Sequence, residues 1–218
     1  MALDKNSLAQ LYSKRARNYD FTANAYYLLG FREFAYRREA VQELKLESGD
    51  TVVEIGCGTG LNFKRLIDCI GPKGRLIGVD LTPQMLEKAA ERVKRHSWSN
   101  VELVQQDAAQ YVFPERVEGV LSTFAMTLIP EYDLVIKNAV AALGPGRRLV
   151  ILDFKKPPRW PSWLIKFFVT ITRPFGVSLD LTKRHPWESL ARYTEKAQLR
   201  ELYFGSAYLC TGQKRRTG

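Results

Sequence analysis

The stretch Thr51–Gly60, with the sequence TVVEIGCGTG, most constrains the fold of this chain. Val52, Val53 and Ile55 are typical of a buried strand, because β-branched side chains favour that conformation. Three glycines follow at alternate positions, where they permit unusual backbone angles and let a ligand approach the main chain closely. A segment with helical spacing comes next. The succession of strand, glycine turn and helix N-terminus predicts a site for a nucleotide-type ligand.

The hundred residues from Thr51 onward alternate between strand and helix patterns, which is typical of a parallel sheet. A short helix at 161–173 and a polar connection at 178–195 are expected near the C-terminus. The other expected elements are strands at 51–55, 75–80, 101–105, 117–122 and 148–153, helices at 31–46, about 60–70, 82–95 and 131–143, and an antiparallel strand pair at 199–204 and 207–211.

Length and charge limit the choice of protein class. The 218 residues fit one main domain, 51–218, preceded by a helical cap over its site at 1–50. No apolar run reaches the roughly 20 residues that span a bilayer. The three cysteines are scattered without metal-ligand spacing, so we expect a cytoplasmic protein without a metal site. The net charge of +10 favours an anionic partner.

The glycine spacing narrows the choice of ligand. A dinucleotide site has the pattern G-x-G-x-x-G, but here the position of the third glycine holds Leu61. A smaller ligand with a nucleoside and one carboxylate fits better. Asp80 ends the second strand, 20 residues after Gly60, where a carboxylate can accept hydrogen bonds from ribose hydroxyls. Asp107 follows the third strand and is placed to meet an adenine amino group.

These residues lie in three motifs, Val52–Gly60, Gly78–Leu86 and Gln106–Ala108. In order and interval they resemble the motifs of class I S-adenosylmethionine-dependent methyltransferases. Gly144–Gly146 resembles the turn that precedes strand five in that family, although Arg147 replaces its last glycine. The resemblance implies a Rossmann-like α/β fold, with a seven-stranded, mostly parallel sheet and helices on both faces. It also implies S-adenosylmethionine as the cofactor.

The resemblance assigns roles to residues of these motifs. Glu54 would steady the glycine turn and the methionine amino end, Asp80 would bind the ribose, and Asp107 would face the adenine. As plain structural alternatives, Asp80 could cap a strand end and Asp107 could cap a helix. The full set expected to bind the cofactor is Glu54, Gly56, Cys57, Gly58, Gly60, Asp80, Leu81, Met85, Asp107, Ala108, Ser122 and Thr123.

A second pattern concerns the methyl acceptor. Apolar residues between Trp160 and Ile171 follow one helical stripe, and basic residues such as Lys155 and Lys156 precede it. Such a stripe can lie in a membrane interface and attract anionic headgroups through residues 155–175. Alternatively, the insertion 155–195 forms a lid packed over the site.

The N-terminal stretches Arg17–Asp20 and Tyr26–Gly30 add to this. They resemble the lead-in of ubiquinone/menaquinone-type methyltransferases, and more closely that of bacterial N-methyltransferases of amino-lipid headgroups. Phe124–Pro130 also resembles the latter group. Tyr19 and Tyr27 are therefore candidates to close over cofactor and substrate, unless they merely pack a helix on the core. His185 is a candidate base, unless it is a plain loop residue.

The leading hypothesis from the sequence is N-methylation of an amino phospholipid or betaine-lipid headgroup. The enzyme would be cytoplasmic and peripheral to the inner membrane face. The first alternative is C-methylation of a quinone ring, or methylation of another hydrophobic small molecule. RNA methylation and cofactor binding without catalysis are further alternatives, and a nucleic-acid partner is not expected.

Overall fold

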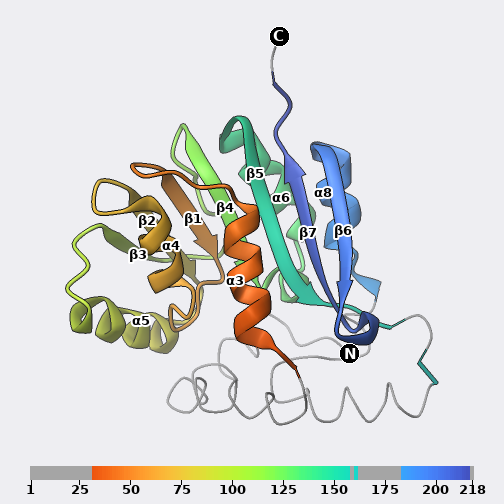
Figure 1. Ribbon diagram of the computed structural model, residues 1–218, viewed down its shortest axis with the longest axis horizontal. Coiled ribbons are helices and arrows are strands. Elements are labelled where there is room, and N and C mark those ends of the chain that lie inside the picture. Colours follow the sequence, from red (N-terminus) through yellow and green to blue (C-terminus); the bar gives the residue numbers. More distant parts are fainter. Residues whose placement is uncertain (1–30, 158–159, 162–182, 217–218) are drawn as a thin grey trace.

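A seven-stranded sheet forms the centre of the molecule, with the strand order β3-β2-β1-β4-β5-β7-β6 (Figure 1). The computed structural model describes residues 31–157, 160–161 and 183–216. β7 runs antiparallel to both of its neighbours, whereas the first five strands pair in parallel. The strands are β1 (Thr51–Ile55), β2 (Arg75–Asp80), β3 (Val101–Gln105), β4 (Val117–Thr123), β5 (Leu143–Phe154), β6 (Glu195–Leu202) and β7 (Ala207–Gln213). The predicted Rossmann-like α/β fold, with a seven-stranded, mostly parallel sheet, is confirmed.

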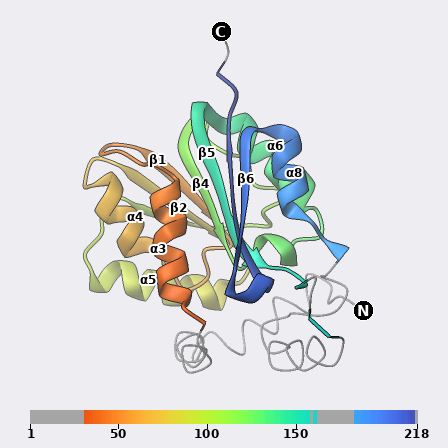
Figure 2. The same ribbon diagram turned by 45° about the vertical axis from the view of Figure 1, so that its right-hand side comes forward.

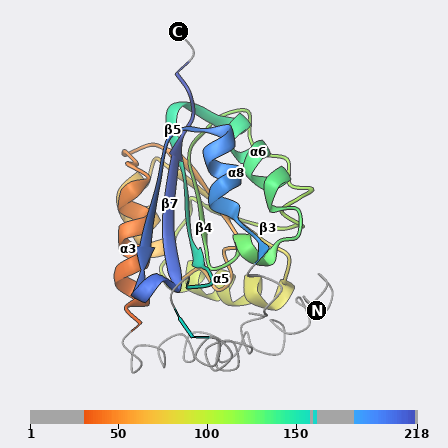
Figure 3. The same cartoon turned by 90° about the vertical axis from the view of Figure 1, so that its right-hand side faces the viewer.

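Helices cover both faces of this sheet. α3, α4 and α5 pack on one face, and α6 and α8 pack on the other, as the views in Figures 2 and 3 show. The helices are α3 (Glu33–Glu43), α4 (Phe63–Ile70), α5 (Pro83–Arg95), α6 (Tyr132–Ala142) and α8 (Pro186–Tyr193). Short 3₁₀ helices lie at η2 (Met126–Leu128) and η5 (Tyr203–Gly205).

The core is divided by the sheet into two apolar clusters, because successive side chains of a strand point to opposite faces. In β1, Val53 and Ile55 pack toward α6 and α8, whereas Val52 packs toward α3 and α4. All three side chains are fully buried. Burial on both faces explains why this strand is a nearly continuous apolar run rather than an alternating one.

The largest departure from the sequence prediction is α8, which occupies part of the expected polar connection at 178–195. The helix has only eight residues, too short for a clear periodic pattern. Tertiary contacts hold it. Leu190 is buried in the core, and the Ser189 hydroxyl donates a hydrogen bond of 2.7 Å to Asp133 on α6. The prediction of a polar connection was therefore wrong for Pro186–Tyr193.

A second departure concerns β5, which begins at Leu143 rather than at residue 148. Leu143 still pairs with Val117 of β4, so the Gly144–Gly146 turn interrupts a strand instead of preceding it. The other predicted elements within the described ranges are present, with ends shifted by a few residues. The helix predicted at 161–173 lies outside the described residues except for Pro161.

Only part of the expected N-terminal cap falls within the described residues. α3 packs on the sheet near β4, β5 and β7, with Ala40, Val41 and Leu44 buried. Residues 1–30 lie outside the described part of the chain. Within the described ranges, none of the helices has both the length and the apolar character needed to cross a membrane. Nor do residues 31–157, 160–161 and 183–216 contain a group of three potential metal ligands.

Phe63 at the start of α4 is a test of this core, because its ring is fully buried against the glycine turn and β2. We expect Phe63→Ala to lower the free energy of unfolding by about 3–5 kcal/mol, through lost burial and the cavity left behind. Val112→Ala, at a side chain that is 83% exposed, is the control and should change it by less than about 0.5 kcal/mol. Urea denaturation followed by circular dichroism measures both. Similar losses would show that Phe63 does not support the core.

Candidate cofactor and acceptor site

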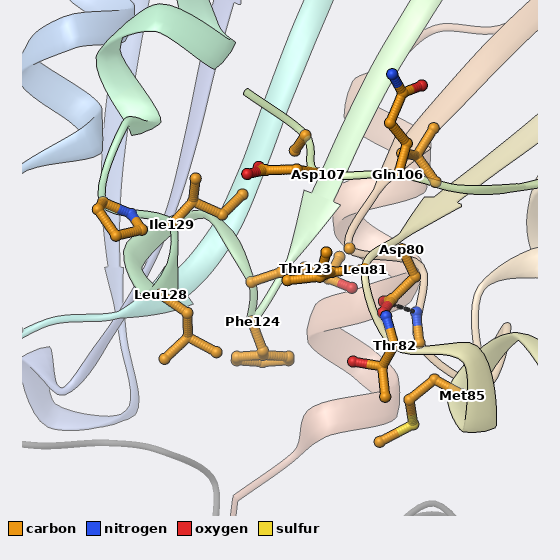
Figure 4. A pocket seen from close by; sticks show the side chains of 16 residues that line it. Asp80, Leu81, Thr82, Met85, Gln106, Asp107, Thr123, Phe124, Leu128 and Ile129 are labelled. Carbon is orange, nitrogen blue, oxygen red and sulfur yellow. Dashed lines mark hydrogen bonds between the residues drawn. The ribbon is translucent and has the colours of Figure 1, made fainter. Parts of the chain in front are cut away.

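A pocket lies at the carboxyl ends of the central strands, where ligands of open α/β sheets bind (Figure 4). It encloses about 820 Å³ of space, part of it open to solvent. Turns that follow β1, β2, β3 and β4 all contribute to it. The lining residues are Gly56, Gly58, Val79, Asp80, Leu81, Thr82, Met85, Gln106, Asp107, Ala108, Thr123, Phe124, Ala125, Leu128, Ile129 and Pro130.

Asp80 connects two of these turns. Its Oδ2 accepts a hydrogen bond of 2.8 Å from the main-chain N–H of Gly58, and its Oδ1 accepts one of 2.8 Å from that of Thr82 (Figure 4). Desolvation raises the pKa of this carboxyl, and the N–H donors oppose that shift. Each carboxylate oxygen keeps a second lone pair. Asp80 can therefore fix the glycine turn and still accept hydrogen bonds from a ribose.

The glycine turn also approaches the chain after β4 very closely. Gly56 has a φ of +66°, and a Cβ built on it would lie 2.3 Å from the Cβ of Ala125. Gly58 has a similar φ of +55°, but a Cβ there would meet no atom of the described part of the chain within 4 Å. Gly56 is therefore required by both its backbone angle and its neighbour, whereas Gly58 is required by its backbone angle alone.

Glu54 lies behind the turn and is 1% exposed. Its Oε1 accepts a hydrogen bond of 2.6 Å from Nδ2 of Asn62, and its Oε2 has no hydrogen-bond partner among the described residues. Burial raises the pKa of Glu54 to about 7, against the opposing effects of the Asn62 hydrogen bond and the Arg37 charge. A buried carboxylate is costly unless a positive group compensates it. Its negative potential behind the glycine turn suits the ammonium and sulfonium charges of S-adenosylmethionine.

Helix α3 reaches the same region through a buried polar network. Arg37, 4% exposed, donates from Nε to Glu33 (2.7 Å) and from Nη1 to the hydroxyl oxygen of Thr123 (2.6 Å). Nδ2 of Asn62 donates to the same hydroxyl oxygen over 2.9 Å. Thr123 lines the pocket, so these bonds link α3 and the start of α4 to the ligand site.

The wall on the β4 side of the pocket is apolar. It consists of the segment Phe124–Pro130, which includes η2 and stands opposite Asp80 and Met85 in Figure 4. Asp153 at the end of β5 accepts a hydrogen bond of 2.8 Å from the N–H of Thr127, and burial raises the pKa of Asp153 to about 6. We call this segment the acceptor wall.

Arg184 holds the acceptor wall from the other side. Its Nη1 donates to the main-chain carbonyls of Thr127 (2.8 Å) and Leu128 (2.9 Å). Together with Asp153, it fixes both the N–H and the C=O groups of η2. The wall is therefore held through its main chain, and its side chains remain available to the pocket.

Eight of the twelve residues predicted to bind the cofactor line the pocket: Gly56, Gly58, Asp80, Leu81, Met85, Asp107, Ala108 and Thr123. The other four lie behind this lining. Glu54 is buried beside Asn62, Cys57 and Gly60 pack near Phe63, and Ser122 is fully buried. Asp107 Oδ1 accepts a hydrogen bond of 3.0 Å from the N–H of Ala109, so it caps a turn rather than a helix.

The candidate catalytic residues are placed differently. Tyr19 and Tyr27 lie outside the described residues. His185 precedes α8 and does not line the pocket; its Nδ1 lies 3.0 Å from Oε1 of Glu188, and its ring stacks on Trp187 at 4.7 Å. A role for any of the three in catalysis stays a prediction.

Sequence reasoning did not assign several lining residues. The acceptor wall comes directly after a predicted strand. Its apolar run Met126–Pro130 is the sequence feature that could have indicated a pocket wall. Gln106 lies beside the predicted Asp107, and Thr82 stands at the start of the helix predicted at 82–95. Arg37 and Asn62 had no signal, because their roles depend on contacts with Thr123 across the fold.

Comparison with known proteins agrees with this geometry. Residues 52–146 match the family model described as "Methyltransferase domain". A demethylmenaquinone methyltransferase from Listeria monocytogenes is 28% identical over 174 residues, covering 77% of this chain and 73% of the relative. Another from Staphylococcus carnosus is 25% identical over 207 residues, covering 92% and 84%. A SAM-dependent methyltransferase structure from Aquifex aeolicus superposes with a TM-score of 0.60 at 18% identity, covering 82% of this chain and 89% of that one.

Fold, motif order and relatives thus support a methyltransferase that uses S-adenosylmethionine and has the class I fold. Within this class, the chain is similar to quinone methyltransferases. The residues present fit the cofactor. The pocket offers a carboxylate for the ribose at Asp80 and apolar side chains for the adenine at Leu81 and Met85, with the buried carboxylate of Glu54 behind the glycine turn.

The contact between Gly56 and Ala125 predicts a difference between two glycine substitutions. Gly58→Ala should cost about 1–2 kcal/mol, because the positive φ disfavours a side chain. Gly56→Ala should cost at least about 1 kcal/mol more, because its Cβ would also collide with Ala125. Ala125→Gly in the Gly56→Ala background should recover part of the second loss. Urea denaturation measures all three variants, and equal losses at both glycines would contradict the close approach.

The raised pKa of Glu54 predicts a pH dependence of stability. The pKa of Glu54 is about 7 in the folded protein, against an ordinary value of 4.5. Protonation of Glu54 therefore stabilises the folded protein. This stabilisation is complete below about pH 4.5 and is lost as the pH rises through 7. It amounts to about 3 kcal/mol, at about 1.4 kcal/mol for each pKa unit. Urea unfolding without cofactor between pH 5 and 8 should show the fall. Glu54→Gln should reduce it, most clearly above pH 6, because Asp153, with a pKa of about 6, contributes to the fall at lower pH. An unchanged slope in Glu54→Gln would contradict the raised pKa.

Proposed function

We propose that this enzyme transfers a methyl group to a ring carbon of a hydrophobic quinol, as the names of its demethylmenaquinone methyltransferase relatives indicate for those proteins. The similarity to these relatives extends over 77–92% of the chain and carries the proposal. The acceptor wall is consistent with it, since Phe124, Leu128 and Ile129 give that side of the pocket an apolar surface. Such a surface suits a planar ring without formal charge.

The chemistry of the transfer is a displacement at a methyl carbon. Bound S-adenosylmethionine supplies a methyl group on a positively charged sulfur. In the reduced acceptor, the ring carbon beside a hydroxyl is the nucleophile. It forms the new carbon–carbon bond as the sulfur–methyl bond breaks, the electron pair of that bond stays on sulfur, and the ring proton is released to water. The acceptor must be in the reduced quinol form, because an oxidised ring lacks this nucleophilic character.

The protein contributes mainly position. Asp80 holds the glycine turn and the turn before α5 together, which fixes the nucleoside end of the site. Asp153 and Arg184 hold η2, which fixes the acceptor wall. Alignment of the ring carbon with the methyl group between these two sides can supply about 7–11 kcal/mol of the barrier reduction.

Amino-lipid N-methylation, the leading hypothesis from the sequence, differs in its acceptor. It rests on the resemblance of the N-terminal stretches and of Phe124–Pro130, whereas the comparisons favour the quinone alternative. Contact with an anionic membrane face through residues 155–175 also stays a prediction, because most of that segment lies outside the described residues. The two hypotheses differ in the methyl acceptor, an uncharged ring in one and a charged headgroup amine in the other, so the identity of the labelled product separates them.

Transfer of a labelled methyl group to defined acceptors tests the proposal. The full-length protein is incubated with methyl-labelled S-adenosylmethionine and one of two substrates: a short-chain demethylmenaquinol kept reduced by dithionite, or vesicles containing phosphatidylethanolamine. We expect label in the quinol fraction, and mass spectrometry should show one added methyl group on the ring. The oxidised quinone is the matched control and should accept little label.

A variant ties the product to the described site. Asp80→Asn keeps the shape of the side chain but weakens its hydrogen bonds to Gly58 and Thr82, so it should lower the transfer rate at least about tenfold. Label appearing in phosphatidylethanolamine and not in the quinol would overturn the proposed acceptor and favour the amino-lipid hypothesis.

A further inference from the structure

The hydroxyl group of Thr123 has an unusual hydrogen-bond balance. Its oxygen accepts from Nη1 of Arg37 at 2.6 Å and from Nδ2 of Asn62 at 2.9 Å. A hydroxyl oxygen has two acceptor lone pairs and one donated proton. Both acceptor positions are occupied, so this hydroxyl can act toward any further group only as a donor.

Neither bond can reverse its direction. The guanidinium of Arg37 carries donors only, so Thr123 must accept from it. The amide of Asn62 faces Oε1 of Glu54 at 2.6 Å as well as Thr123. Above about pH 7, where Glu54 is ionised, this carboxylate requires the nitrogen of the amide rather than its oxygen. The charges of Arg37 and Glu54 therefore set the orientation of the Thr123 hydroxyl from opposite sides.

The remaining proton of Thr123 has no acceptor among residues 31–157, 160–161 and 183–216, because both hydrogen bonds of this hydroxyl in the described structure are accepted ones. The residue is 5% exposed, and it lines the pocket. A buried hydroxyl proton without an acceptor is unfavourable. A ligand oxygen bound in the pocket can therefore accept this proton.

The position of Thr123 along the sheet edge identifies that ligand oxygen. Asp107 follows β3, Asp80 ends β2, the glycine turn follows β1, and Thr123 ends β4, in the spatial order of the strands. With the adenine at Asp107 and the ribose at Asp80, the amino-acid end of the cofactor lies toward Thr123. This end carries an ammonium group, which can only donate, and a carboxylate, which can only accept.

We propose that Thr123 donates a hydrogen bond to the carboxylate of S-adenosylmethionine, and that Arg37 of α3 is the positioning residue that makes Thr123 an obligate donor. The inference rests on the cofactor and is independent of the proposed acceptor. It assigns α3 a role in recognising the amino-acid end of the cofactor. The positive charge of Arg37 behind the hydroxyl also strengthens a bond to an anionic oxygen.

Decarboxylated S-adenosylmethionine tests this assignment, because it keeps the adenosine, sulfonium and ammonium groups and lacks only the carboxylate. Isothermal titration calorimetry gives the dissociation constants of both compounds for the full-length protein. We expect the wild type to bind S-adenosylmethionine about 10- to 100-fold more tightly, the usual range for a hydrogen bond to a charged group. In Thr123→Val this ratio should fall to about threefold or less.

Further variants of Thr123 and Arg37 separate a positioning role from support of the fold. Thr123→Ser keeps a hydroxyl and should keep most of the ratio. Arg37→Lys keeps a cation beside Glu33 and should retain more of the ratio than Arg37→Met. In the Thr123→Val background, Arg37→Met should change the ratio no further, because Arg37 acts through Thr123. A general loss of packing would weaken both ligands equally and leave the ratio unchanged.

Three results would overturn the proposal. The first is an unchanged ratio in Thr123→Val. The second is an additive effect of Arg37→Met on that variant. The third is a Thr123→Val enzyme with normal binding of S-adenosylmethionine but a raised KM for the methyl acceptor, which would assign the hydroxyl to the acceptor instead. Since the titration contains no acceptor, failure of the quinol proposal leaves its outcome unaffected.

Discussion

The two hydrogen bonds that Asp80 accepts determine the geometry of the site. One carboxylate binds the N–H of Gly58, which follows β1, and the N–H of Thr82, which precedes α5. Through them the ends of two neighbouring strands share one anchor, and the glycine turn is held open toward the pocket. Because Gly56 in this turn contacts Ala125, the acceptor wall is placed by the same anchor. Asp80 therefore anchors the glycine-turn side of the pocket, whereas Asp153 and Arg184 hold the η2 side.

The cofactor half of the site was largely predictable from sequence, because its residues follow strands with strong apolar patterns. Parallel strands bring their carboxyl ends to one edge, so Asp80 and Asp107 could be assigned to a common site before the structure was known. The glycine spacing then favoured a ligand smaller than a dinucleotide. The same reasoning could not place Arg37, which precedes all of the strands and whose partner Thr123 lies 86 residues further along the chain.

The parts that sequence did not predict share a physical cause. α8 is held by the contact of Ser189 with Asp133 and by burial of Leu190, and neither contact leaves a local pattern. The acceptor wall takes its shape from main-chain bonds to Asp153 and Arg184, which apolar side chains do not reveal. Local sequence predicts an element only where that element's own pattern, rather than a distant partner, stabilises it.

The contacts of α3 have a consequence for how the chain folds during synthesis. The helix leaves the ribosome before every strand of the sheet, yet Glu43 binds Arg148 on β5, 105 residues later, and Glu39 binds Arg200 on β6, 161 residues later. α3 can therefore complete its contacts only after most of the chain has been made. Contacts of such high sequence separation slow folding and lengthen the time during which apolar surfaces stay exposed. The contacts of α3, the first helix of the described residues, thus depend on strands that are made last.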